Sequence, residues 1–180
     1  NSEIRKKIKK IKKIKKKFDT HLQKEIISKL DFSLTNDQNK TLDEINKDLC
    51  SEKKMFRLLQ GDVGSGKTIV SLLSAFNTIN SGFQVAVMAP TEILARQHFL
   101  LAKKLFPKNI KIELLSGKST YRDKKSILEK LLNMKTDIIF GTHALFQKKV
   151  QFKKLGLVII DEQHKFGVNQ RKKLSDKAGK

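Results

Sequence analysis

One stretch of eight residues, GDVGSGKT at positions 61–68, constrains the fold of this chain more than any other. It fits the pattern G-x-x-x-x-G-K-[ST] at every fixed position. A mostly apolar run, residues 56–59, comes before it and another, residues 69–73, follows it, which is the order strand, loop and helix that the pattern requires. Glycines let the backbone adopt positive φ and approach a ligand, and the N–H groups of a helix N-terminus attract an anion. The stretch therefore predicts a loop that holds the phosphates of a nucleoside triphosphate.

The residues of this loop have separate expected roles. Lys67 is expected to contact the β- and γ-phosphates, and the Thr68 hydroxyl is expected to bind Mg²⁺. The backbone of the remaining residues is expected to surround the phosphates: Gly61, Asp62, Val63, Gly64, Ser65 and Gly66. A glycine-rich turn that matches the pattern by chance is the other interpretation, and many unrelated reactions use such a loop.

Composition restricts the class of protein only loosely. The 180 residues suffice for one α/β domain, and the net charge of +21 suggests a polyanionic partner. A biased genome composition with a solvated surface explains the same charge, so charge alone does not decide. The single Cys50 excludes an internal disulfide and fits a reducing compartment. No apolar run approaches the roughly 20 residues of a membrane-spanning helix, so we expect no membrane partner.

The N-terminal segment differs from the rest of the chain. Residues 3–18 are rich in Lys and Arg, and their apolar positions recur at helical spacing. This pattern predicts a basic amphipathic helix whose apolar side docks on a membrane surface, a nucleic acid or a neighbouring domain. We favour a helix that connects to another domain. Residues 1–30 are therefore expected to form a basic connector region, and residues 31–180 an α/β domain.

After residue 30, helical and strand patterns alternate. Because the strands read as continuous apolar runs separated by helices, we expect a mostly parallel sheet with helices on both faces. Helices are predicted at 21–30, 36–49 (capped by Thr35), from the loop to about 79, 92–106 and 121–133. Strands are predicted at 56–60, 84–89, 111–115, 137–140 and 155–160, and a short turn at 141–146.

An acidic pair follows the last of these strands. Apolar residues 157–160 run directly into Asp161 and Glu162, at the carboxyl edge of the sheet, where open α/β sheets bind ligands. Asp161 is expected to hold Mg²⁺, and Glu162 to orient and deprotonate the water that attacks the γ-phosphate. Solvated acids in a surface turn are the alternative, which the presence of Lys67 upstream disfavours.

Four segments together make the chain resemble the superfamily II helicases and translocases. Residues 161–164 (DEQH) resemble motif II, residues 89–98 (APTEILARQH) motif Ia, and residues 141–145 (GTHAL) motif Ib. Residues 32–38 (FSLTNDQ) resemble the segment that carries an adenine-reading Gln. The resemblance covers residues 31–176. It implies a RecA-like P-loop NTPase lobe of an ATP-dependent translocase on double-stranded DNA, one that remodels stalled forks and branched recombination intermediates.

The resemblance also implies roles for single residues. Gln38 is expected to read the adenine edge, and His164 to couple the nucleotide site to a neighbouring lobe or to DNA. Six residues are expected to face the DNA backbone: Thr91, Arg96, Ser116, Gly117, Thr142 and His143. For Ser116 and Gly117 a plain loop is the other interpretation, and for His143 a histidine that caps a turn.

Residues 165–171 are expected to sense DNA, with contacts from Lys165, Phe166 and Arg171. In this hypothesis Phe166 repacks when DNA binds and moves Glu162 or His164 into hydrolytic geometry. The alternative is that Phe166 is an ordinary core residue.

The resemblance further implies parts that these residues do not contain. A second motor lobe with an arginine finger and an N-terminal wedge domain are expected in the same polypeptide, so these residues alone are expected to be nearly inactive. The whole protein is expected to be a monomer in the bacterial cytoplasm, associated with the nucleoid.

Three other readings stay open. A transcription–repair coupling or primosomal-type translocase has similar motifs, although Gln163 disfavours it because such proteins more usually carry a second Glu there. The second is a P-loop kinase or transporter ATPase. The third is a non-enzymatic nucleic-acid-binding module.

Overall fold

The computed structural model describes residues 20–50, 55–60 and 66–162, with side chains described for 21–48 and 66–161. The basic helix predicted over residues 3–18 lies outside them. The described helices are α2 Thr20–Ser28, α3 Asn36–Cys50, α4 Lys67–Asn80, α5 Glu92–Leu105, α6 Tyr121–Leu132 and the 3₁₀ helix η1 His143–Phe146. The described strands are β1 Met55–Gln60, β2 Gln84–Met88, β3 Ile112–Leu115, β4 Ile138–Gly141 and β5 Leu155–Glu162.

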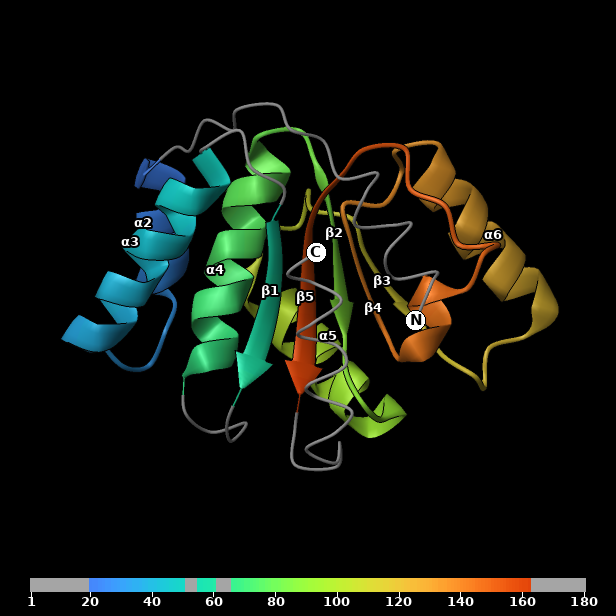
Figure 1. Ribbon diagram of the computed structural model, residues 1–180, viewed down its shortest axis with the longest axis horizontal. Coiled ribbons are helices and arrows are strands. Elements are labelled where there is room, and N and C mark those ends of the chain that lie inside the picture. Colours follow the sequence, from blue (N-terminus) through green and yellow to red (C-terminus); the bar gives the residue numbers. More distant parts are fainter. Residues whose placement is uncertain (1–19, 51–54, 61–65, 163–180) are drawn as a thin grey trace.

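The strands form one parallel sheet in the order β1-β5-β2-β4-β3 (Figure 1). The last strand, β5, therefore lies between the first two and pairs with both. Helices cover both faces of the sheet, as Figure 1 shows. The predicted α/β architecture is confirmed.

The direction of each crossover explains which face each helix covers. Parallel strands are joined almost always by right-handed crossovers, so a reversal of direction along the sheet moves the connecting helix to the other face. The connections through α4 and α5 step outward from β1 to β2 and from β2 to β3. The connections through α6 and η1 step back from β3 to β4 and from β4 to β5. Helices α4 and α5 accordingly share one face, and α6 and η1 share the other.

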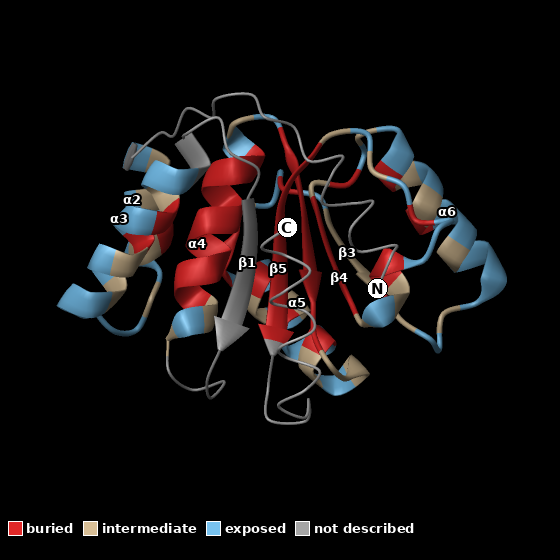
Figure 2. Cartoon of the chain, viewed as in Figure 1, coloured by how far each residue is buried: buried red, intermediate tan, exposed pale blue. Residues whose placement is uncertain are grey.

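Alternating strand residues divide the interior into two cores. Val85 and Val87 of β2 pack in the core with α4 and α5, whereas Ala86 and Met88 pack with α6 and η1. This is the period of two expected of a strand that is buried on both faces. Helix α4 is buried along nearly its whole length, from Ile69 to Ile79 (Figure 2). Its hydroxyl side chains bond back to their own helix, as Ser74 Oγ does to the Val70 carbonyl at 3.0 Å.

Helices α2 and α3 form a further layer outside α4. Ile26 of α2 is buried in the same core as Leu42 of α3, so part of the segment assigned to the connector packs with the α/β domain. An amide cluster joins the three helices: Asn77 Nδ2 donates to Gln23 Oε1 at 2.7 Å and to Asn46 Oδ1 at 3.1 Å. These contacts fix α3, and the residues at its N-terminus, relative to α4.

One predicted strand end is wrong, and a second strand is less buried than its apolar residues suggest. Strand β5 continues through Asp161 and Glu162 instead of ending at Ile160, because its pairing with β1 runs on to the register Gln60↔Glu162. Strand β3 is only partly buried at Ile112, Glu113 and Leu114, because it lies at the edge of the sheet that the described strands form. The other elements predicted within the described residues are confirmed, with ends that differ by at most two residues. Among the described helices, none has the length and apolar character needed to cross a membrane.

Candidate nucleotide-binding site

The N-terminus of α4 is built to receive an anion. Its N-cap, Gly66, has φ 76°, a left-handed conformation that side chains other than glycine rarely adopt. Gly66 has no side chain that could cap this end, and the N–H groups of a helix N-terminus attract an anion. Lys67 is exposed and Thr68 is half-buried at the start of the helix. Residues 61–65 of the predicted phosphate loop lie outside the described residues.

Gln38 lies directly beside this helix N-terminus. Its amide nitrogen occupies the place where a Cβ on residue 66 would be, so a side chain at that position would require Gln38 to move. The Gln38 carbonyl accepts a hydrogen bond from the Thr35 N–H at 2.8 Å, and Thr35 Oγ1 accepts one from the Gln38 N–H at 3.1 Å. This reciprocal capping box starts α3 and fixes the carbonyl end of the Gln38 side chain. The amide nitrogen is thereby held beside Gly66.

Asp161 reaches the same edge of the sheet from β5. It pairs in register with Leu59 of β1, the strand that leads into the phosphate loop. Like Leu157 and Ile159, it belongs to the set of alternate residues that faces α4 and α5. Residue 161 is only 3% exposed.

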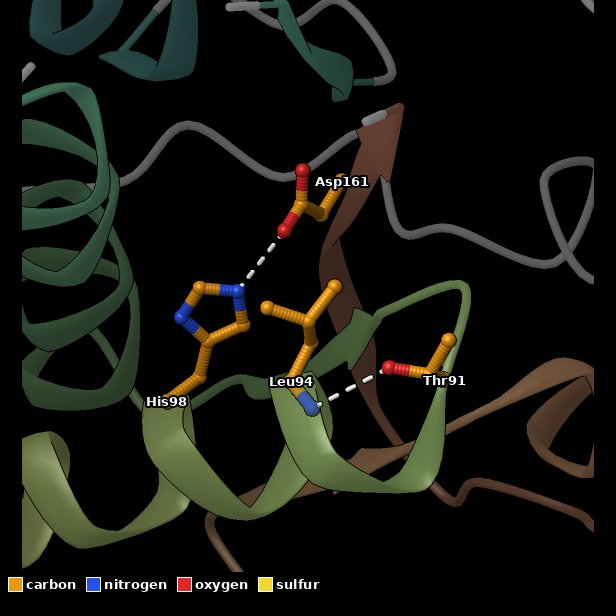
Figure 3. A network of polar contacts seen from close by, with 4 residues as sticks. All are labelled: Thr91, Leu94, His98 and Asp161. Atoms are coloured by element: carbon orange, nitrogen blue, oxygen red, sulfur yellow. Dashed lines mark hydrogen bonds and ion pairs between the residues drawn. The ribbon is translucent and has the colours of Figure 1, made fainter. Parts of the chain in front are cut away.

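A buried histidine holds the Asp161 carboxylate. His98 Nε2 lies 2.8 Å from Asp161 Oδ2, and the two side chains are 3% and 5% exposed (Figure 3). An ionised carboxylate can only accept hydrogen bonds, so Nε2 carries the hydrogen and donates it. Buried charge needs such a partner, and His98 supplies it from the second turn of α5. Oδ1 has no hydrogen bond within the described part of the chain and remains for another ligand.

His98 is the site residue that sequence reasoning missed. In the sequence it stands out only as the last residue of the segment 89–98, which resembles motif Ia. The buried residues of α5 are Ala95, His98, Ala102 and Leu105, which recur at helical spacing. A polar residue on this apolar stripe was the available signal, because a buried imidazole needs a hydrogen-bond partner.

The residues predicted to face DNA follow β2, β3 and β4 in the chain, at the carboxyl edge of the sheet. Thr91 is the N-cap of α5, and its Oγ1 accepts a hydrogen bond from the Leu94 N–H at 3.3 Å (Figure 3). Arg96 is exposed on the outer side of the same helix. Thr142 is half-buried and precedes η1, whose first residue, His143, is exposed.

The turn after β3 is bonded to the first residue of α5. The Glu92 carboxylate accepts hydrogen bonds from the Gly117 N–H and from Ser116 Oγ, the latter at 3.4 Å. The Gly117 N–H thus already donates to Glu92. To contact a DNA phosphate it would have to give up this hydrogen bond. Ser116 and Gly117 are in this way tied to α5 and to Thr91 beside it.

The other predicted site residues lie outside the described residues or lack a described side chain. Glu162 belongs to β5 by its backbone, next to Asp161. The other four are His164, Lys165, Phe166 and Arg171, and the structure does not test their roles.

The oxygen ligands of this site fit Mg²⁺. Thr68 offers a hydroxyl and Asp161 a buried carboxylate, the donor types that this ion prefers. Within the described ranges, no group of three or more His, Cys, Asp or Glu side chains could hold a metal ion by itself.

Comparisons with known proteins agree with this geometry. The family model for the DEAD/DEAH box helicases matches residues 35–179. ATP-dependent DNA helicase RecG of Thermotoga maritima is 50% identical over 176 residues, which are 97% of this chain and 23% of that protein. RecG of Borreliella burgdorferi is 53% identical over 157 residues, 87% of this chain and 23% of that protein.

A solved structure, described as RecG bound to a three-way DNA junction, is also similar. Its TM-score is 0.78 at 49% sequence identity, and the match covers 91% of this chain and 23% of that one. The chain thus spans about a quarter of the length of the relatives that it matches.

Proposed function

Because this chain belongs to the DEAD/DEAH box helicase family, we propose that it is the ATP-binding first motor lobe of a RecG-type DNA helicase. In this proposal the whole protein hydrolyses ATP to translocate on double-stranded DNA and to remodel stalled forks and branched recombination intermediates. One observation carries it: the register Leu59↔Asp161 sets an acidic pair beside the strand that leads into the phosphate loop. The similarity to RecG proteins supports this reading over a P-loop kinase, a transporter ATPase or a non-enzymatic module.

The residues of the site divide the work of phosphoryl transfer. The N–H groups at the start of α4 bind phosphate oxygens, and the Lys67 ammonium contacts the β- and γ-phosphates. Thr68 and Asp161 hold Mg²⁺, which when bound supplies positive charge to the phosphate oxygens. Glu162 orients the attacking water and accepts its proton. His164 communicates with the partner lobe or with DNA.

The loops at the carboxyl edge of the sheet provide the DNA-facing surface. Exposed Arg96 supplies charge, while Thr91, Thr142 and His143 supply hydroxyl and imidazole groups that grip phosphate without reading sequence. Residues 165–171, with Lys165, Phe166 and Arg171, extend this surface and sense DNA. The second lobe and the N-terminal wedge domain are partners within the same polypeptide, which acts as a monomer at the bacterial nucleoid.

ATP hydrolysis by the full-length protein tests this function. We expect a three-way junction to raise the steady-state rate at least about tenfold over the rate without DNA, and a linear duplex of equal length to raise it less. The 180-residue chain alone should hydrolyse ATP negligibly with either DNA, because its site lacks the arginine from the second lobe. Failure of both DNAs to stimulate the full-length protein would contradict the proposal. Equal stimulation by both DNAs would contradict only the preference for branched DNA.

The role of Gln38 can be separated from its structural role. Because Glu can replace Gln in a capping box, Gln38→Glu retains the acceptor for the Thr35 N–H but loses the amide donor. A bidentate amide–adenine contact is worth about 1–3 kcal/mol, so the preference for ATP over GTP in kcat/KM should fall about tenfold. The ratio of the two nucleotides is the readout, since an added charge near the phosphates affects both equally. Thr35→Ala is the control: it weakens the cap of α3 and should leave the preference unchanged.

A further inference from the structure

We propose that His98 is a positioning residue that ties the magnesium-binding carboxylate of Asp161 to helix α5, and through it to the DNA-facing loops. This inference rests on the proposed ATP-driven function. It assigns no chemistry to His98 itself, which is separated from solvent and offers Asp161 a single hydrogen bond. The role of His98 is to fix the position of the Asp161 carboxylate relative to α5.

The geometry at one end of this connection is specific. The bond from Nε2 to Oδ2 measures 2.8 Å between two side chains that are almost completely buried. It joins residues 63 apart in the sequence, one on a helix and one at the end of a central strand. A side chain that engages one oxygen of a carboxylate sets the direction of the other, and such outer-shell partners govern the affinity of the ligand for metal. His98 therefore orients Oδ1, the oxygen that has no partner among the described residues.

The other end of α5 is bonded to two of the predicted DNA-facing segments. Thr91 caps the helix by accepting from the Leu94 N–H, and Glu92 accepts from Ser116 and Gly117 of the neighbouring turn. From Thr91 to His98 is seven residues, a helical rise of about 10 Å. A helix of this length moves as one body, so a force on the Thr91 end is felt at the His98 side chain. Figure 3 shows both hydrogen bonds on α5, one at each end of these two turns.

The two sides of α5 differ in burial. On its inner side Ala95, Ala102 and Leu105 are buried. On its outer side Ile93, Arg96 and Leu100 are exposed. His98 is thus the polar connection between this helix and β5 on an otherwise apolar inner stripe. We infer that DNA bound at the α5 N-terminus adjusts the Asp161 carboxylate through His98.

The experiment compares four variants of the full-length protein: His98→Leu, His98→Asn, His98→Gln and Leu105→Ala. Leu removes the hydrogen-bond donor. The Asn amide nitrogen lies too close to the backbone to reach Asp161 Oδ2, whereas the Gln amide nitrogen takes the position of Nε2. Leu105→Ala disturbs the buried side of the same helix without touching Asp161 and controls for a loss of packing. The readout is the Mg²⁺ concentration at half-maximal binding of a fluorescent ATP analogue, measured with and without a DNA junction, together with binding in EDTA.

We expect His98→Leu and His98→Asn to raise the Mg²⁺ midpoint at least about tenfold, as loss of an outer-shell partner typically does. They should leave binding in EDTA unchanged and abolish any shift of the midpoint by DNA. His98→Gln should stay within about threefold of the unchanged protein. If His98→Leu does not fold, His98→Asn carries the comparison. An unchanged midpoint in His98→Asn, or an equal shift in Leu105→Ala, would overturn the inference. Lack of Mg²⁺-dependent nucleotide binding in the unchanged protein would instead refute the proposed function.

Discussion

Replacement of Lys67 by Ala in the full-length protein is expected to lower DNA-stimulated ATP hydrolysis by about 10³-fold. Lys67 is the first residue of α4 and is exposed, at the helix end whose N–H groups attract an anion. Removal of one preorganised group that stabilises transition-state charge typically costs about 10²–10³ in kcat, and Lys67 also contributes to binding of the phosphates. The measurement is steady-state hydrolysis with a saturating DNA junction.

Two observations keep this result interpretable. Because Lys67 is exposed, the thermal unfolding midpoint of the variant should match that of the unchanged protein. Lys47→Ala removes an equally exposed cation in the last turn of α3, at the end away from Gln38, and should leave hydrolysis unchanged. Hydrolysis by Lys67→Ala within a few-fold of normal would mean that the phosphate loop does not serve this reaction.

Replacement of Asp161 is expected to have the second large effect, and two substitutions separate its two functions. Asp161→Asn removes the charge that binds Mg²⁺ but still offers an oxygen to the His98 N–H. Asp161→Ala removes both. Each should lower DNA-stimulated hydrolysis by about 10³-fold, because the charge that holds the metal is lost in both.

Only Asp161→Ala should also destabilise the lobe. It leaves the buried His98 donor without an acceptor, at a cost of about 2 kcal/mol in the free energy of unfolding. The check is the midpoint of thermal unfolding of the full-length protein, which should fall for Ala and hold for Asn. Asp43→Asn, at an exposed position of α3, is the control for loss of a carboxylate. Equal stability of the two Asp161 variants would show that the pair with His98 contributes little to folding.

Much of the fold is readable from local patterns. The apolar runs and their glycine and polar boundaries predict the strands and helices, because burial on both faces demands continuous apolar strands. The elements on each side of the predicted phosphate loop, β1 and α4, are readable for the same reason. Thr35 and Gln38 also follow from local chemistry: a capping box spans four residues, and the structure has it.

The run of apolar residues in a strand does not by itself predict where the strand ends or how far it is buried. The apolar run of β5 ends at Ile160, yet pairing with β1 extends the strand through Glu162. The half-burial of β3 likewise depends on its place at the edge of the sheet, which its own sequence does not reveal. Both differences arise from neighbours that are distant in sequence.

The sequence by itself determined the alternation of strands and helices and the place of the acidic pair at the end of the last strand, because these depend on residues that are adjacent or one helical turn apart. Only the tertiary structure decided the order of the strands, which inserts β5 between β1 and β2 and so brings Asp161 beside Leu59 of β1, the strand that leads into the predicted phosphate loop. It also decided the partner of His98. Helical spacing places this histidine on the inner stripe of α5, but which group it meets there depends on packing between α5 and a strand 63 residues away.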